Sequence, residues 1–243
     1  MIGRTALDLR LAPRADGLKP SATLGVNARV KALKAEGKDV IAFGAGEPDF
    51  DTPTLICDAA VDALRAGMTH YQPVPGTPEA REAIAEKLRR DNGIECAAAD
   101  IVITAGAKHA VYLALQALLD DGGRNEVILP TPAWVSYQPM IELSGGRAVE
   151  VRGAMENDFR ITPDQLASAI TDRTAALMLN SPSNPCGTMY GPDDLAALAE
   201  VLTDHPHVAV ISDEIYERLV YGPEPHRSFA TLDGMADRTI TVN

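Results

Sequence analysis

The sequence predicts an α/β fold in which helices cover both faces of a mainly parallel β-sheet. Short runs rich in β-branched residues alternate with longer segments whose apolar residues recur at helical spacing. This alternation is typical of βαβ units, which build parallel sheets buried on both faces. Ligands bind beyond the carboxyl ends of the strands in such sheets, so we expect a site at the strand ends.

Each strand is expected from a short apolar run, and the ends of the helices are expected from capping residues, prolines and glycines. Strands are expected over residues 40–43, 101–104, 126–129, 148–151, 175–179, 208–211 and 239–242. Helices are expected over residues 26–36, 78–92, 107–119, 134–143, 163–170 and 192–202. The helix over 78–92 has the clearest signals, because Thr77-Pro78 is a cap followed by proline and Gly93 stands behind it.

A Gly/Pro/Asp-rich stretch at residues 44–53 is the expected domain joint. Residues 1–50 would then supply this joint and the N-terminal segment of a small domain. Residues 51–243 would form a large domain that binds a cofactor, incomplete at its C-terminus.

Composition excludes several kinds of partner. The net charge of −12 opposes binding to nucleic acid or to an anionic membrane. Three widely spaced cysteines, without a C-x-x-C pair, favour neither a disulfide framework nor a metal site. The N-terminus has no signal-peptide pattern and no run is long enough to span a bilayer. We therefore expect a soluble cytoplasmic protein.

Two expected strand ends suit a phosphorylated aromatic ligand. Gly106-Ala107-Lys108 follows residues 101–104 and opens a helix, where small residues and free N–H groups favour a phosphate. The alternative is a tight turn with a surface lysine. Trp134, the single tryptophan, follows residues 126–129 and offers a face for ring stacking, although core packing is the better explanation of a tryptophan taken by itself.

Two further strand ends carry polar side chains. Asn184 lies in a stiff loop of asparagines and prolines over residues 180–187, where it could aim its amide into a cleft or serve a structural turn. Asp213 closes the buried strand over residues 208–211, and a carboxylate there needs a cation or donor such as a protonated pyridine nitrogen. Tyr216 follows and could bond a phenolate oxygen on the same ring. The alternative for Asp213 is a cap of the next turn.

These motifs occur together and in a fixed order. They are GAGEPDFDTP, YQPVPGTPEAR, TAGAKHA, TPAWVSY, NSPSNPCG, SDEIYE and TITVN, spread from about residue 19 to the end of the chain. In sequence and spacing they resemble the aspartate-aminotransferase-like class I aminotransferases, which are pyridoxal-5′-phosphate (PLP) enzymes of fold type I. Ala107 and Cys186 stand where many members have glycine and threonine.

The resemblance implies a role for each motif residue. Gly106, Ala107 and Lys108 would hold the cofactor phosphate, and Trp134 would stack on its ring and border the substrate. Asn184 would bond the ring oxygen and the substrate carboxylate. Asp213 would pair with the ring nitrogen and Tyr216 would bond the ring oxygen. Gly46 would bind the substrate carboxylate, and Tyr71 would reach the phosphate of a neighbouring subunit, which implies a homodimer.

The implied reaction is amino-group transfer from L-aspartate or a related amino acid to 2-oxoglutarate. The alternatives are a PLP-dependent β-lyase of the same fold and a catalytically dead fragment. In the family, the lysine that carries the Schiff base stands about four residues after the position of Asn243, which these 243 residues do not reach. We therefore expect negligible transaminase activity from these 243 residues alone.

Overall fold

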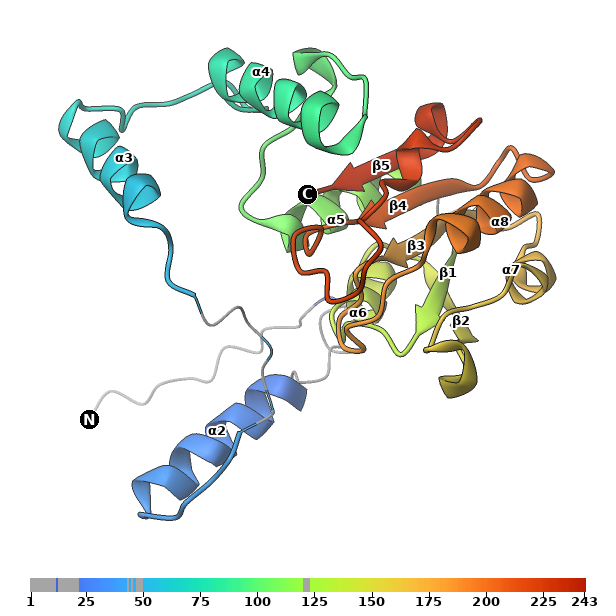
Figure 1. The fold of residues 1–243 in the computed structure, drawn as a ribbon, viewed down its shortest axis with the longest axis horizontal. Helices are drawn as coiled ribbons and strands as arrows, with labels where there is room; N and C mark the ends of the chain where they lie inside the picture. The colour runs from blue at the N-terminus through green and yellow to red at the C-terminus, as the bar shows by residue number, and fades with distance from the viewer. Residues whose placement is uncertain (1–11, 13–21, 43, 45, 47–49, 120–122) are drawn as a thin grey trace, which may run out of the picture.

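The sheet at the centre of the molecule is entirely parallel (Figure 1). The computed structural model describes residues 12, 22–42, 44, 46, 50–119 and 123–243. Within these ranges five strands lie in the order β2-β1-β3-β4-β5. Their bounds are β1 Glu126–Thr131, β2 Arg147–Arg152, β3 Thr174–Asn180, β4 Ala209–Asp213 and β5 Thr239–Val242.

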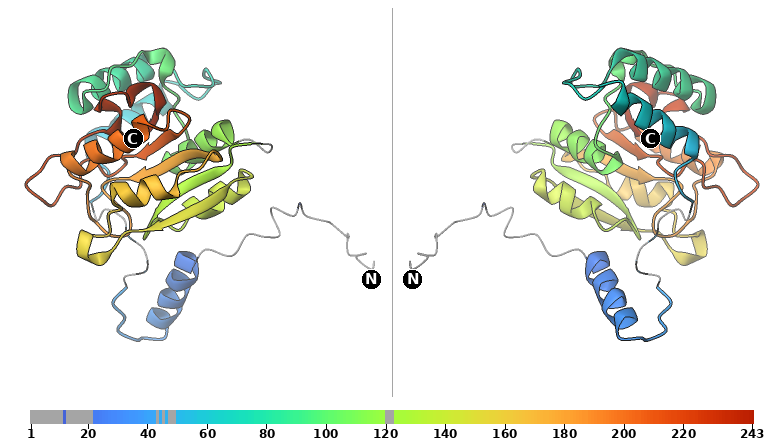
Figure 2. Two further views of the ribbon diagram at one scale, coloured as in Figure 1. Left: turned by 90° about the vertical axis from the view of Figure 1, so that its right-hand side faces the viewer. Right: turned by 90° about the vertical axis from the view of Figure 1, so that its left-hand side faces the viewer.

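Helices pack on both faces of this sheet (Figures 1 and 2). One face carries α5 (Ala107–Leu118) and α6 (Tyr137–Leu143), and the other carries α7 (Pro163–Ala169) and α8 (Pro192–Thr203). Neighbouring residues of a strand belong to different cores, because side chains alternate across a sheet. In β3, for example, Met178 packs with the α5 and α6 core, whereas Leu177 packs with the α7 and α8 core. The predicted fold class is therefore confirmed.

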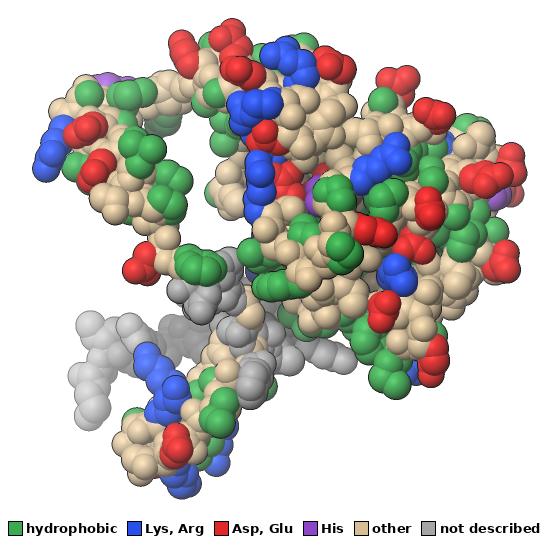
Figure 3. Space-filling view, in the orientation of Figure 1, with side chains coloured by type: hydrophobic (Ala, Val, Ile, Leu, Met, Phe, Trp, Pro, Cys, Tyr) green, Lys and Arg blue, Asp and Glu red, His purple; other side chains and the backbone are tan. Residues whose placement is uncertain are grey.

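The N-terminal helices lie outside these layers (Figure 1). They are α2 (Ala22–Ala35), α3 (Thr54–Arg65) and α4 (Pro78–Lys87), and α4 continues as a π-helical turn over Leu88–Asn92. No side chain of α3 is buried, and Figure 3 shows hydrophobic side chains along this helix. Short 3-10 turns occupy Ala98–Asp100, Met155–Asn157, Phe229–Thr231 and Ala236–Arg238. None of the helices in the described ranges has the length and apolarity needed to cross a membrane.

Local signals placed several boundaries correctly. The Thr77 hydroxyl accepts a hydrogen bond from the Ala80 N–H at 3.3 Å, as an N-cap does, and Gly93 ends the π turn at φ 70°. Strand β5 has the predicted bounds, and β1, β2 and β3 extend beyond their predicted cores. Strand β4 begins one residue later and ends two residues later than predicted.

Two predicted strands and two helix starts are wrong. Helix α2 begins at Ala22, four residues before the predicted start at Val26. Residues 40–42 form no strand, and Phe43 lies outside the described residues. Residues 101–104 also join no strand, because Ile103 donates its N–H to Pro75 in a loop, at 2.9 Å, rather than to a sheet neighbour. Helix α6 begins at Tyr137, three residues after the predicted start at Trp134. Helix α3 was not predicted.

Candidate active site

Asp213 is a buried carboxylate at the carboxyl end of β4. Its side chain is 3% exposed, and its Oδ2 accepts a hydrogen bond from the Tyr137 hydroxyl at 2.7 Å. Its Oδ1 accepts a longer bond from the Ile215 N–H at 3.3 Å. Burial raises the pKa of Asp213 above its ordinary value, and the Tyr137 hydrogen bond opposes this rise. The pKa of Tyr137 is raised too, by burial first and then by the neighbouring Asp213 charge.

The backbone at Asp213 is held by the strands on both sides. Asn180 ends β3 directly beside Asp213 in the register of the sheet. The Asp213 carbonyl accepts hydrogen bonds from the Asn180 side-chain amide at 3.0 Å and from the Ser181 N–H at 3.2 Å. On the other side, the Glu214 N–H donates to the Val242 carbonyl of β5 at 2.8 Å. The position of the carboxylate is therefore fixed by three adjacent strands.

Asn184 and Tyr216 meet beside this carboxylate. The Asn184 N–H donates to the Asn180 side-chain oxygen at 2.8 Å, which anchors the loop after β3. The Asn184 side-chain amide lies 3.4 Å from the Tyr216 hydroxyl. A pocket between the ends of β1 and β3 is lined in part by Tyr137, Asn180 and Asn184. The amide and the phenol thus present hydrogen-bonding groups at the same edge of the sheet.

Trp134 lies between Lys108 and Tyr137. The rings of Trp134 and Tyr137 meet edge to face, with centroids 5.2 Å apart and planes at 83°. The Lys108 Nζ lies over the Trp134 ring, 4.9 Å from its centroid, in a cation–π contact. Trp134 also packs against the α5 and α6 core, which agrees with the core-packing alternative, whereas its stacking role stays a prediction.

The start of α5 leaves donors free. Gly106 precedes the helix at φ 85° and ψ 164°, a conformation that is essentially restricted to glycine. Its carbonyl accepts hydrogen bonds from the N–H groups of His109 and Ala110. Among the described residues, the N–H groups of Ala107 and Lys108 have no acceptor. Two donors and the positive end of the helix dipole are therefore available to an anion.

The structure brings together most of the predicted site residues. Contacts link Lys108 to Trp134, Trp134 to Tyr137, and Asn184 to Tyr216, and Asn180 bonds both Asp213 and Asn184. Two predicted residues stay apart from these. Gly46 is exposed, and Tyr71 is fully exposed, without a described contact to the cluster.

Sequence reasoning missed Tyr137. The available signal was its position three residues after Trp134, which places both on one side of a helical turn. That spacing does not reveal the Asp213 partner, which lies 76 residues further along the chain.

A family model, "Aminotransferase class I and II", matches residues 38–243. The chain belongs to this family. Among its curated aminotransferase relatives, the aspartate aminotransferase of Bacillus subtilis is 48% identical over 97% of this chain and 59% of the relative. The aspartate/prephenate aminotransferase of Cereibacter sphaeroides is 47% identical over 93% of this chain and 56% of the relative.

Solved aminotransferase structures share the fold. The aspartate aminotransferase of Thermus thermophilus with maleate superposes with a TM-score of 0.89 at 43% identity, over 96% of this chain and 59% of that one. The enzyme from Rhizobium meliloti gives a TM-score of 0.91 at 42% identity, over 96% of this chain and 58% of that one. The chain therefore spans about three fifths of the length of these relatives.

Proposed function

We propose that the chain supplies most of the residues that bind PLP, here called the cofactor bed, in an aminotransferase. This enzyme would transfer an amino group from L-aspartate or a related acidic amino acid to 2-oxoglutarate. Because the chain spans 59% of the Bacillus subtilis relative, the reaction is proposed for a polypeptide that also supplies the remaining elements. The observation that carries the proposal is the buried Asp213 carboxylate at the end of β4, which is bonded to Tyr137. Asn180 bonds the Asp213 carbonyl and Asn184, and Asn184 in turn contacts Tyr216.

Asp213 fits a protonated pyridine nitrogen. A buried carboxylate is costly unless a cation or several donors face it. Among the described residues, no Lys, Arg or His forms an ion pair with Asp213. A pyridinium N–H would supply the missing cation and return the pKa of Asp213 toward its ordinary range. PLP, when bound, accepts the electrons released as the amino acid loses its α-proton, and a protonated ring nitrogen favours this.

The start of α5 fits the phosphate. The free N–H groups of Ala107 and Lys108 point along the helix axis, and Gly106 leaves open space where a Cβ would lie. In the structure the Lys108 ammonium covers the Trp134 ring. Movement of this ammonium to the phosphate would add a charge-assisted bond and uncover the ring face for stacking.

The remaining roles are proposed from the family. Asn184 and Tyr216 would bond the ring oxygen, and Asn184 and Gly46 would bind the substrate carboxylate. Tyr71 would reach the phosphate in a neighbouring subunit of a homodimer. Its full exposure is compatible with a partner contact. The domain boundary near residues 44–53, the cytoplasmic location and the inactivity of the 243 residues alone stay predictions.

Acidic substrates are supported by the names of the relatives. The curated proteins from Bacillus subtilis and Geobacillus stearothermophilus are both aspartate aminotransferases, at 48% identity. The Thermus thermophilus structure contains maleate, a dicarboxylate. These names favour a donor with a second carboxylate.

The cofactor bed can be tested with pyridoxamine 5′-phosphate (PMP), which has no aldehyde to react with surface lysines. Because Trp134 is the single tryptophan, its fluorescence reports a ring stacked on it. We expect saturable quenching by PMP, and binding at least about tenfold weaker for pyridoxamine without the phosphate, since charge-assisted bonds are lost. Equal affinity for both ligands, or no binding, would contradict the proposed bed.

The reaction is tested separately. The polypeptide encoded by the complete reading frame should convert L-aspartate and 2-oxoglutarate to oxaloacetate and glutamate. Loss of the amino group without formation of glutamate would instead indicate a lyase.

A further inference from the structure

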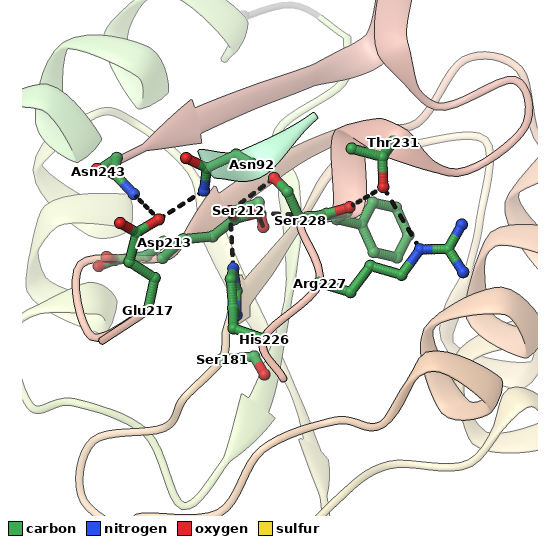
Figure 4. Close-up of polar contacts among 12 residues, drawn as sticks. Asn92, Ser181, Ser212, Asp213, Glu217, His226, Arg227, Ser228, Thr231 and Asn243 are labelled. Carbon is green, nitrogen blue, oxygen red and sulfur yellow. Dashed lines mark hydrogen bonds and ion pairs between the residues drawn. The ribbon is translucent and has the colours of Figure 1, made fainter. Parts of the chain in front are cut away.

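Glu214, the residue after Asp213, is a second buried carboxylate, and its hydrogen bonds are satisfied. It is 1% exposed and accepts hydrogen bonds from Ser212 Oγ at 2.7 Å and from the Phe229 N–H at 3.1 Å. It also accepts from Ser228 Oγ at 2.6 Å and meets His226 Nε2 at 3.1 Å. His226 and Ser228 point toward the end of β4 in Figure 4. Burial and four hydrogen-bond partners therefore hold the Glu214 side chain in one position.

The side chains of Asp213 and Glu214 lie on opposite faces of the sheet. Successive residues of a strand point to opposite sides. Asp213 faces Tyr137, which belongs to the α5 and α6 core, whereas Glu214 contacts Phe229, which belongs to the α7 and α8 core. The shared side with Ser212, two residues earlier, agrees with this alternation.

The peptide that joins the two residues is bonded on both sides. The Asp213 carbonyl accepts from β3 and its following loop, and the Glu214 N–H donates to β5. These bonds hold the peptide within the sheet, while the donors at residues 226–229 fix the Glu214 side chain on the far face. A rotation of the chain that re-aimed Asp213 would have to break bonds to Glu214.

We propose that Glu214 is a positioning residue, which acts through the backbone to hold the Asp213 carboxylate toward the ring nitrogen of the cofactor. It touches neither cofactor nor substrate. This inference rests on the proposed function, because it assigns the partner of Asp213 to that nitrogen.

The test compares PMP with 1-deazapyridoxamine 5′-phosphate, in which a carbon replaces the ring nitrogen. The ratio of the two dissociation constants, measured by Trp134 fluorescence, isolates the contact to that nitrogen. We expect the wild-type chain to prefer PMP by at least about tenfold, as a charge-assisted hydrogen bond provides. Asp213→Asn should reduce this ratio to about one. Glu214→Gln should reduce it at least about fivefold, because a misdirected carboxylate loses most of that bond.

Glu126→Gln is the matched control. Glu126 is also a buried carboxylate with three partners, but it lies at the start of β1, at the opposite end of the sheet. Its substitution should lower stability yet keep the ratio within about twofold of wild type, since no contact reaches Asp213. If Glu214→Gln does not fold, Ser228→Ala removes one donor, keeps the carboxylate, and should still reduce the ratio at least about twofold.

The outcomes separate the two proposals. A wild-type preference that survives in both Glu214→Gln and Ser228→Ala overturns the positioning role and leaves the cofactor bed intact. A wild-type chain that binds PMP without preferring it to the deaza compound overturns the Asp213 assignment and this inference with it. No binding of PMP overturns the proposed function as a whole.

Discussion

The Tyr137 hydroxyl donates a 2.7 Å hydrogen bond to Oδ2 of Asp213, and both side chains are buried. This bond joins helix α6 to the end of β4 across the carboxyl edge of the sheet. Among the described residues, no cationic side chain forms an ion pair with Asp213. Under the proposed function, this pair would accept the cationic ring nitrogen of the cofactor.

Tyr137→Phe should raise the pKa of Asp213 further, because the Tyr137 hydrogen bond opposes the effect of burial. We also expect the free energy of unfolding at pH 7 to fall by about 1.5–3 kcal/mol, typical of a lost bond to a charged group. Carboxyl carbon NMR of Asp213 and urea unfolding measure the two effects. Tyr190→Phe is the control, because that buried hydroxyl accepts from the Ile161 N–H and does not touch Asp213. A pKa change of equal size in the control would refute the assignment.

Asp213→Asn should stabilise the ligand-free chain at neutral pH. The folded-state pKa of Asp213 is raised, so the ionised form opposes folding. Its cost is absent below the ordinary pKa of 3.8, grows as the pH rises from there to the folded-state pKa, and is fully present above that value. The variant and wild type should thus unfold at similar urea concentrations near pH 3, and the variant should be the more resistant one at pH 7. A less stable variant at pH 7 would show that Tyr137 more than offsets the burial cost.

Glu126→Gln should show the opposite dependence on pH. The Arg147 hydrogen bond lowers the pKa of Glu126 below its ordinary value of 4.5, and the Thr171 hydroxyl contributes in the same direction. The stability that the carboxylate provides is present above pH 4.5 and is lost as the pH falls through the folded-state pKa. We expect the variant to be less stable by about 1–3 kcal/mol at pH 7 and the difference to shrink in acid. A difference that stays constant with pH would contradict this account.

Gly106→Ala should weaken both the fold and the anion site. At φ 85° and ψ 164° an alanine is strained, although a Cβ would meet no atom within 4 Å. We expect a loss of about 1–3 kcal/mol in stability and a PMP affinity at least about tenfold weaker, because relief of the strain turns the donors at the start of α5 away. Gly234→Ala also strains a glycine of positive φ (73°), before β5 at the opposite end of the sheet, and should leave PMP binding unchanged. Equal loss of binding in both variants would point to general unfolding.

The sequence predicted most of the sheet and the identity of its strand ends, because both follow from local patterns. The run over Thr239–Val242 is bounded as predicted, and Asp213 stands at the end of a buried strand as expected. The prediction of a strand over residues 101–104 was wrong. A β-branched run forms a strand only beside a partner strand, and the local sequence does not show whether a partner is present. The contacts of Tyr137 and Glu214 were missed for a related reason. Their partners are brought close only by packing of α6 and of residues 226–229 against β4.

A crystal structure of the chain soaked with PMP would show directly whether Asp213 faces the ring nitrogen of the cofactor. We expect the ring nitrogen within hydrogen-bond distance of the Asp213 carboxylate, the ring stacked on Trp134, and the phosphate on the N–H groups at the start of α5. A ligand bound elsewhere, or one whose ring nitrogen faces away from Asp213, would contradict this expectation.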